Sequence, residues 1–161
     1  MSEKTSVKFA KKNFKTLCKT LDQNKWKYEK DKKNFKINID PDFNDVDFNV
    51  RISFNTGLEI ISVYIPVSTA PRDRREIAAI AVSVANYDFI AGSFDYNCMS
   101  GNIIFRMTST YADSLLSAKV FEYLLNQSCK IVKNYRSKIR EACEKNLSED
   151  GVIKLIGGVN V

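Results

Sequence analysis

Histidine is absent from the sequence, and with it most of the residue patterns that mark a reaction centre. Without histidine, the Ser-His and Cys-His nucleophile systems and the commonest metal ligand are excluded. The four cysteines, Cys18, Cys98, Cys129 and Cys143, show neither CxxC spacing nor a zinc pattern, so we interpret them as reduced, mostly small hydrophobic residues. We therefore predict a protein that is not an enzyme, with no catalytic residue, no cofactor and no metal site.

Long apolar runs, glycine and proline are also scarce. No segment approaches the roughly 18 consecutive apolar residues of a membrane span, and no apolar stretch follows the lysines of the N-terminus, so we expect a cytoplasmic protein without membrane contact. Six glycines, three prolines and 44% apolar residues are typical of an ordinary globular protein. A chain of 161 residues fits one domain. We place this domain at residues 1–146, followed by a tail at 147–161.

Charge is present but unevenly distributed. Residues 1–40 hold twelve lysines against five acidic residues, residues 41–114 hold five arginines against nine acids, and residues 115–161 hold eight basic residues against five acids. Both ends of the chain are therefore basic and the middle is acidic, within a net charge of +6.

The spacing of apolar residues changes twice along the chain. From residue 7 to 21 the apolar positions recur every three or four residues, which predicts an amphipathic helix with a lysine-rich outer side. From residue 26 to 66 the spacing is two, in four runs with turns between them, which predicts a four-stranded antiparallel meander. We expect Pro66 and Pro71 to end this sheet, and Ser68 or Thr69 to cap the helix that follows.

That helix, predicted over residues 71–87, is apolar on nearly every side. Its main stripe contains larger side chains, and the opposite side carries Ala78, Ala79, Val82 and Ala85. A helix of this kind is buried on two sides or covered by a second subunit. We predict a homodimer through these four residues, and burial against the last long helix of the same chain is an equal alternative.

The segment AGSFDYNCMSGNIIFRMTS (residues 91–109) brings Asp95, Tyr96, Cys98 and Ser100 close together. Alternating apolar residues on both sides of a glycine-containing loop at residues 97–101 predict a β-hairpin. Polar residues in such a loop usually serve the turn itself. Cys98 also has no base beside it to form a thiolate, so we interpret the cluster as a bend and not as a reaction centre.

The C-terminal third is predicted to be helical. Residues 115–145 carry an apolar stripe without proline or glycine, which predicts a helix of roughly 46 Å. In the tail, Ser148 can open a short helix that Gly157 and Gly158 close.

This order of elements resembles the type III secretion chaperone-like fold, and within it the YbjN-type domain. The resemblance is carried by VDFNVRISF (46–54), GLEIISVYIP (57–66), RDRREIAAIAVSVAN (72–86), GSFDYN (92–97), GNIIFRM (101–107) and SLLSAKVFEYLL (114–125). It covers about 120 residues and implies an α+β fold with an N-terminal helix, a four-stranded meander, a helix, a β-hairpin and a long C-terminal helix. The relatives tend to be acidic, whereas this chain is basic at both ends.

The resemblance implies a chaperone-like or regulatory module that holds a segment of another protein on its sheet and first helix. In the secretion chaperones the second helix commonly forms the homodimer contact, which agrees with the prediction for residues 78–85. We take Lys8, Phe9, Lys12 and Trp26 as the candidate partner surface, because lysines and aromatic side chains gather there in the sequence. The alternative is a nucleic-acid-associated protein that uses the same basic helix together with the basic C-terminal helix.

Overall fold

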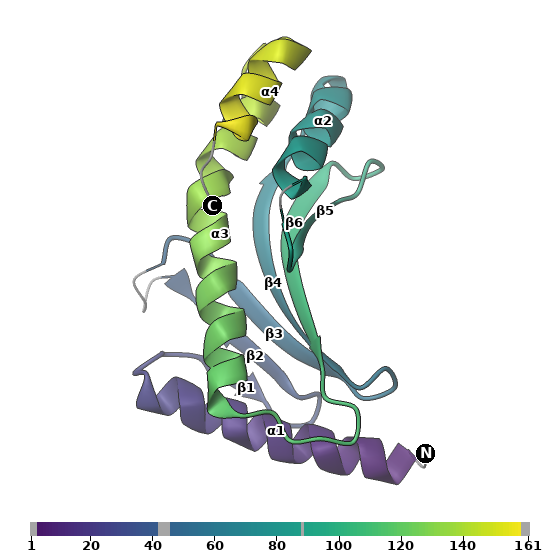
Figure 1. The fold of residues 1–161 in the computed structure, drawn as a ribbon, viewed down its shortest axis with the longest axis vertical. Helices are drawn as coiled ribbons and strands as arrows, with labels where there is room; N and C mark the ends of the chain where they lie inside the picture. The colour runs from purple at the N-terminus through teal and green to yellow at the C-terminus, as the bar shows by residue number, and fades with distance from the viewer. Residues whose placement is uncertain (1–2, 42–45, 88, 159–161) are drawn as a thin grey trace. The chain divides into compact units, whose positions relative to one another are not determined.

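A six-stranded antiparallel sheet and four α-helices make up the part of the chain that this computed structural model describes, residues 3–41, 46–87 and 89–158 (Figure 1). The helices are α1 (Glu3–Gln23), α2 (Arg75–Asn86), α3 (Ala118–Glu144) and α4 (Glu149–Gly157). The strands are β1 (Glu29–Asp31), β2 (Lys36–Ile39), β3 (Val50–Asn55), β4 (Ile60–Thr69), β5 (Ser93–Tyr96) and β6 (Asn102–Thr110), in the sheet order β1-β2-β3-β4-β6-β5. The predicted α+β fold is confirmed, including the meander, the hairpin and the long last helix.

The chain forms two compact units. Unit 1 comprises Met1–Tyr64 and Met107–Gln127, and unit 2 comprises Ile65–Arg106 and Ser128–Val161. The helix α4, which lies in the segment 147–161, belongs to unit 2. Strands β4 and β6 and helix α3 contribute residues to both units. An unbroken apolar pattern along these long elements is why the division is not apparent in the sequence.

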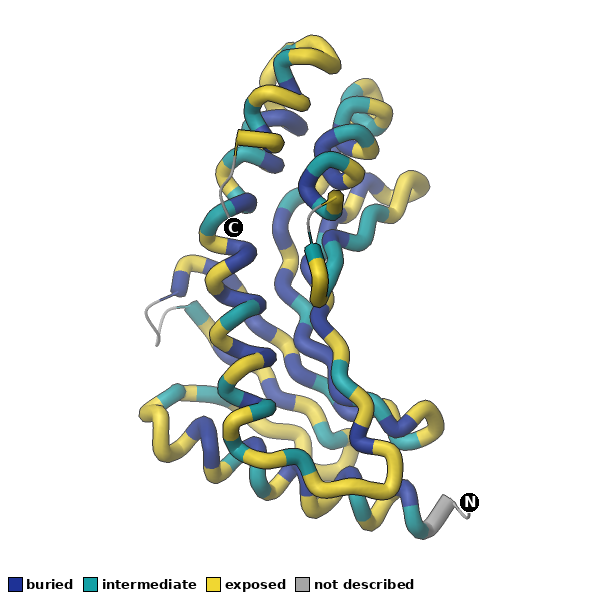
Figure 2. The backbone as a smooth tube through the Cα atoms, viewed as in Figure 1, coloured by how far each residue is buried: buried dark blue, intermediate teal, exposed yellow. Residues whose placement is uncertain are grey.

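In unit 1, alternation along the strands and the stripe on α1 place the core. Along β2 and β3 every second residue is buried, and α1 buries Ala10, Phe14, Leu17 and Leu21 (Figure 2). The Phe14 ring packs edge-on against Phe35 and Phe54, with centroid separations of 5.7 and 6.0 Å. One face of β2 and β3 is therefore buried in the core, and the other face carries their polar residues.

Among the described residues, four that are not glycine have positive φ, and all four lie in unit 1: Lys25, Phe35, Glu59 and Asp113, at 60°, 50°, 55° and 49°. The turn at Lys25 corrects one prediction. The amide of Trp26 donates to the carbonyl of Leu21, and the amide of Lys25 donates to the carbonyl of Asp22, so this turn caps the end of α1, and β1 begins only at Glu29. The alternation of Trp26 and Tyr28 in the sequence predicts a strand at these residues, whereas the structure has none before Glu29.

The prediction that Pro66 ends the sheet is wrong, because β4 continues through it to Thr69. The pairs between β3 and β4 run from Asn55↔Ile60 to Arg51↔Tyr64. Pro66 is exposed and lies beyond these pairs, where a strand edge tolerates a residue without an N–H group.

In unit 2, α2 begins after a short 3-10 turn (Arg72–Arg74) and packs beside α4 (Figure 1). Neither Ser68 nor Thr69 caps it: the N-cap position is Arg74, with no side-chain cap. The Arg74 guanidinium instead donates to Asn146 Oδ1 (3.2 Å) and to the carbonyl of Leu147 (3.2 Å), which ties the start of α2 to the segment before α4. The two terminal nitrogens of this guanidinium therefore have acceptors, although it lies at the start of a helix.

The β5–β6 hairpin packs around aromatic side chains. The rings of Phe89, Phe94, Phe105 and Tyr135 form one cluster, with centroid separations of 5.2–6.3 Å. The hairpin turn ends at Gly101, which has φ of +82°, and a Cβ there would lie 2.2 Å from the carbonyl oxygen of Ala70. Only glycine fits this close approach of two backbone segments.

The tail helix α4 is capped as the sequence predicted, since the Ser148 side chain accepts from the amide of Gly151. Val152 and Ile156 are its buried residues. Within the described ranges no helix is both long and apolar enough to cross a membrane, although α3 has 27 residues.

Candidate functional site

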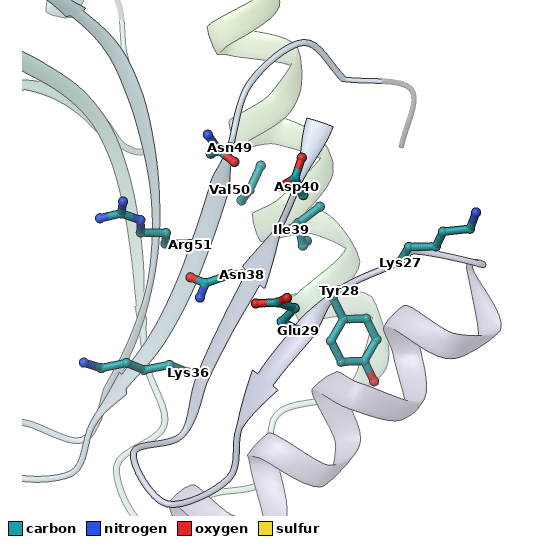
Figure 3. Close-up of a pocket in the computed structure, with 10 residues that line it drawn as sticks. All are labelled: Lys27, Tyr28, Glu29, Lys36, Asn38, Ile39, Asp40, Asn49, Val50 and Arg51. Atoms are coloured by element: carbon teal, nitrogen blue, oxygen red, sulfur yellow. The ribbon is translucent and has the colours of Figure 1, made fainter. Parts of the chain in front are cut away.

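A cavity of about 730 Å³ opens over the polar face of β1–β3 in unit 1 (Figure 3). We call it the trough. The residues that line it are Lys27, Tyr28, Glu29, Lys36, Asn38, Ile39, Asp40, Asn49, Val50 and Arg51. Most of these side chains are polar or charged, so the trough suits a ligand that offers hydrogen bonds and charges as well as apolar groups.

Strand register determines which side chains meet in the trough. Ile37 and Ile39 point into the core, so Lys36 and Asn38, which alternate with them along β2, point outward. Asn38 pairs with Glu29 on one side and with Arg51 on the other. A carboxylate, an amide and a guanidinium therefore follow one another across three strands, as Figure 3 shows.

One wall of the trough is fixed to α1 by Tyr28. Its hydroxyl donates to Asp22 Oδ1 at 2.9 Å and lies 3.3 Å from the carbonyl oxygen of Cys18. Burial and these hydrogen bonds raise the pKa of Tyr28, so the phenol stays neutral at physiological pH. The side chain thus anchors the segment between α1 and β1.

Three of the cysteines, Cys18, Cys129 and Cys143, have the properties of protonated thiols. Burial raises the pKa of Cys129 to about 11 and also raises the pKa of Cys18 and Cys143. A thiol with a raised pKa is a poor nucleophile at neutral pH. Among the described residues, no group of three or more Asp, Glu, Cys or His side chains is arranged to hold a metal ion.

The polar cluster of residues 95–100 serves the hairpin. Asp95 forms an ion pair with Arg106 at 2.7 Å, and the Tyr96 hydroxyl donates to the carbonyl of Arg75. The Asn97 side chain accepts from the amides of Met99 and Ser100. Each of these polar groups has a structural partner, which agrees with the interpretation of the segment as a bend.

The four residues of the candidate partner surface do not form one patch. Lys8 and Lys12 are exposed on the outer side of α1, and Phe9 is half-buried beside them. Trp26 is half-buried at the other end of the helix, where it lines a small cavity with Leu17 and Phe121 of unit 1. About twelve residues of helix, or roughly 18 Å, separate Lys12 from the end of α1 at which Trp26 lies.

The four residues of the candidate dimer face also differ in their surroundings. Ala78, Val82 and Ala85 are buried within the chain, whereas Ala79 is exposed. Helix α2 contacts α4 and β5, and Asn86 exchanges two hydrogen bonds with the backbone of Phe94 in β5. The chain itself therefore covers two sides of α2, through β5 and the tail helix α4.

Sequence reasoning did not identify the trough. Its outward residues Lys36, Asn38 and Arg51 occupy the polar positions of alternating runs, so the signal for an open sheet face was present. What was missing is the register that places Glu29, Asn38 and Arg51 in one row, because alternation gives the face of each residue but not its neighbour on the next strand.

Comparisons with known proteins identify the fold. No protein-family model matches the sequence, and none of the curated proteins matches it. Among solved structures, the chain is similar to the HopA1–SchA chaperone–effector complex, with a TM-score of 0.55, 12% identity, and coverage of 76% of this chain and 91% of that chain. The chain has the YbjN and secretion chaperone-like fold.

Two further structures agree with this. YbjN from E. coli, a candidate transcription regulator, has a TM-score of 0.57 at 13% identity, over 76% of this chain and 87% of that chain. The ExsC–ExsE complex has a TM-score of 0.56 at 12% identity, over 82% of this chain and 95% of that chain. The resemblance stated from the sequence is thereby confirmed at the level of the fold.

Proposed function

We propose that the chain is a non-enzymatic protein-binding module, chaperone-like or regulatory, that holds a segment of a partner protein on its sheet and first helix. The trough carries this proposal. It is an open cavity of about 730 Å³ over a sheet face whose side chains are mostly polar or charged, a volume within the usual range of binding sites. Two of the structures that share the fold are complexes, and one of them is described as a chaperone with its effector.

Crosslinking from the trough tests the proposal. With p-benzoylphenylalanine in place of Asn38, at the centre of the trough, we expect irradiation in cells of the source species to give a discrete protein adduct. The matched control carries the same group in place of Lys130, an exposed residue of α3 in unit 2, and should give no such adduct.

The adducts are separated by electrophoresis and the partner is identified by mass spectrometry. Absence of a protein adduct at position 38, or the same adducts from both positions, would contradict the proposal. An adduct at position 38 that nuclease removes would show that nucleic acid, and not a protein segment, occupies the trough.

The homodimer is a separate proposal, and the structure limits how α2 can take part in it. Because Ala78, Val82 and Ala85 are buried by the chain, a dimer through α2 must use the exposed side at Ala79 and Ser83. We expect Ala79→Arg to convert a dimer into an 18.4 kDa monomer in sedimentation at tens of micromolar, without loss of helical signal. A wild-type chain that sediments as a monomer under the same conditions would remove the dimer.

A further inference from the structure

Helix α1 carries a continuous row of lysines on its outer side: Lys8, Lys11, Lys12, Lys15 and Lys19, here called the lysine face. All five are exposed, and within the described residues none belongs to an ion pair. Asp22, the one acidic residue of α1 after Glu3, accepts the Tyr28 hydroxyl.

The lysine face has an energetic cost for the helix. Lys8 and Lys12, Lys11 and Lys15, and Lys15 and Lys19 are four residues apart, and each such pair of like charges opposes helix formation by about 0.2–0.5 kcal/mol. The end of α3 is arranged differently, since Arg140 pairs with Glu144 at 3.6 Å, and Lys145, just after the helix, pairs with Glu141 at 2.8 Å. Solubility alone does not require unpaired lysines, because any mixture of charges provides it.

Lys30, in β1, also lies close to α1. Tyr28 fixes the start of β1 against the Cys18–Asp22 turn of α1, and Lys30 Nζ lies 5.6 Å from the Tyr28 ring centroid. Because Tyr28 is hydrogen-bonded to α1, Lys30 lies beside the same helix, and β1 is an edge strand with all three residues exposed.

The features of unit 1 favour an acidic protein segment over nucleic acid as the occupant. Stacking of bases requires exposed aromatic rings, but Phe9, Trp26 and Tyr28 are half-buried. The trough carries Glu29 and Asp40 as well as Lys27, Lys36 and Arg51, a mixture of charges that a phosphate backbone, which is negative throughout, cannot match in full. A polypeptide can meet these acids with basic or amide side chains and meet the lysines with its own acids.

We infer that the partner segment is acidic, a stretch rich in aspartate and glutamate that docks along the lysine face beside β1. This inference rests on the proposed function and adds the chemistry of the partner to it. Charge complementarity of this kind also accelerates association, so binding of the segment should weaken steeply as salt is raised.

Fluorescence anisotropy with the full chain tests the inference. The probes are three labelled 15-residue peptides in which valine alternates with glutamate, glutamine or lysine, and a 15-nucleotide oligothymidylate. We expect the glutamate peptide to bind tightest, and its affinity to fall by about fivefold in the double variant Lys15→Gln with Lys19→Gln, given the usual contribution of two surface ion pairs.

The control double variant, Lys130→Gln with Lys154→Gln, removes the same charge from exposed sites of unit 2 and should change the affinity less than twofold. Glutamine keeps helix propensity, and circular dichroism verifies folding. Equal binding of the glutamate and glutamine peptides, equal effects of the two double variants, or tighter binding of oligothymidylate would overturn the inference. The first outcome would leave the proposed function intact, because that depends on a protein adduct at position 38.

Discussion

Replacing Val152 by aspartate is expected to detach α4 from unit 2. Val152 is fully buried, and burial of such a side chain contributes about 2 kcal/mol, to which the cost of burying a carboxylate is added. The loss cannot exceed the free energy with which α4 docks, because the helix can simply leave. We expect unit 2 to lose about 3 kcal/mol of stability, measured as a lower urea midpoint with increased binding of a hydrophobic dye.

The neighbouring residue provides the control. Ile153 lies on the same helix but is 47% exposed, so Ile153→Asp adds the same charge without burying it. This variant should remain within about 0.5 kcal/mol of wild type. Equal losses in the two variants would show that charge, and not packing of α4, determines the stability. Gly151 and Gly157 lower the intrinsic helix propensity of α4, which makes its dependence on packing stronger.

Replacing Asn13 by leucine is expected to destabilise unit 1 by about 2–4 kcal/mol. The Asn13 side chain is fully buried in α1, where its amide donates to the carbonyl of Ser114 at 2.9 Å and its oxygen accepts from the amide of Leu116 at 2.8 Å. Leucine is similar in size but leaves both backbone groups without these partners. Urea denaturation followed by circular dichroism measures the loss.

For comparison, Asn126→Leu changes an exposed asparagine on α3 and should have little effect. If Asn13→Leu proved neutral, the bond to the β6–α3 connection would not be what fixes α1. Since α1 carries the lysine face, we also expect Asn13→Leu to weaken acidic-peptide binding only where it unfolds the helix.

The fold was largely predictable because two periodicities in the sequence are strong. Spacing of three to four residues on α1 and α3, and of two on β2, β3 and β6, is required to bury one face of each element. A strand was wrongly predicted where apolar and polar residues alternate but do not pair with a neighbouring strand. Trp26 and Tyr28 alternate like strand residues, yet the turn at Lys25 places Trp26 against the end of α1.

The candidate site was less accessible to prediction. The lysines of α1 were apparent in the sequence, but the trough depends on which strand neighbours which, and that is a tertiary property. Helix α2 shows the same limit of sequence-based prediction. Its apolar sides revealed that it needed cover, while the identity of the cover, α4 and β5, comes from segments that are distant in the sequence.

The shortage of glycine noted at the outset has a thermodynamic consequence in unit 1. Lys25, Phe35, Glu59 and Asp113 adopt a left-handed backbone conformation that glycine would occupy freely and that costs other residues about 1 kcal/mol or more each. Glycine at these turns is therefore expected to relieve backbone strain and to stabilise unit 1, without altering any side chain in the trough.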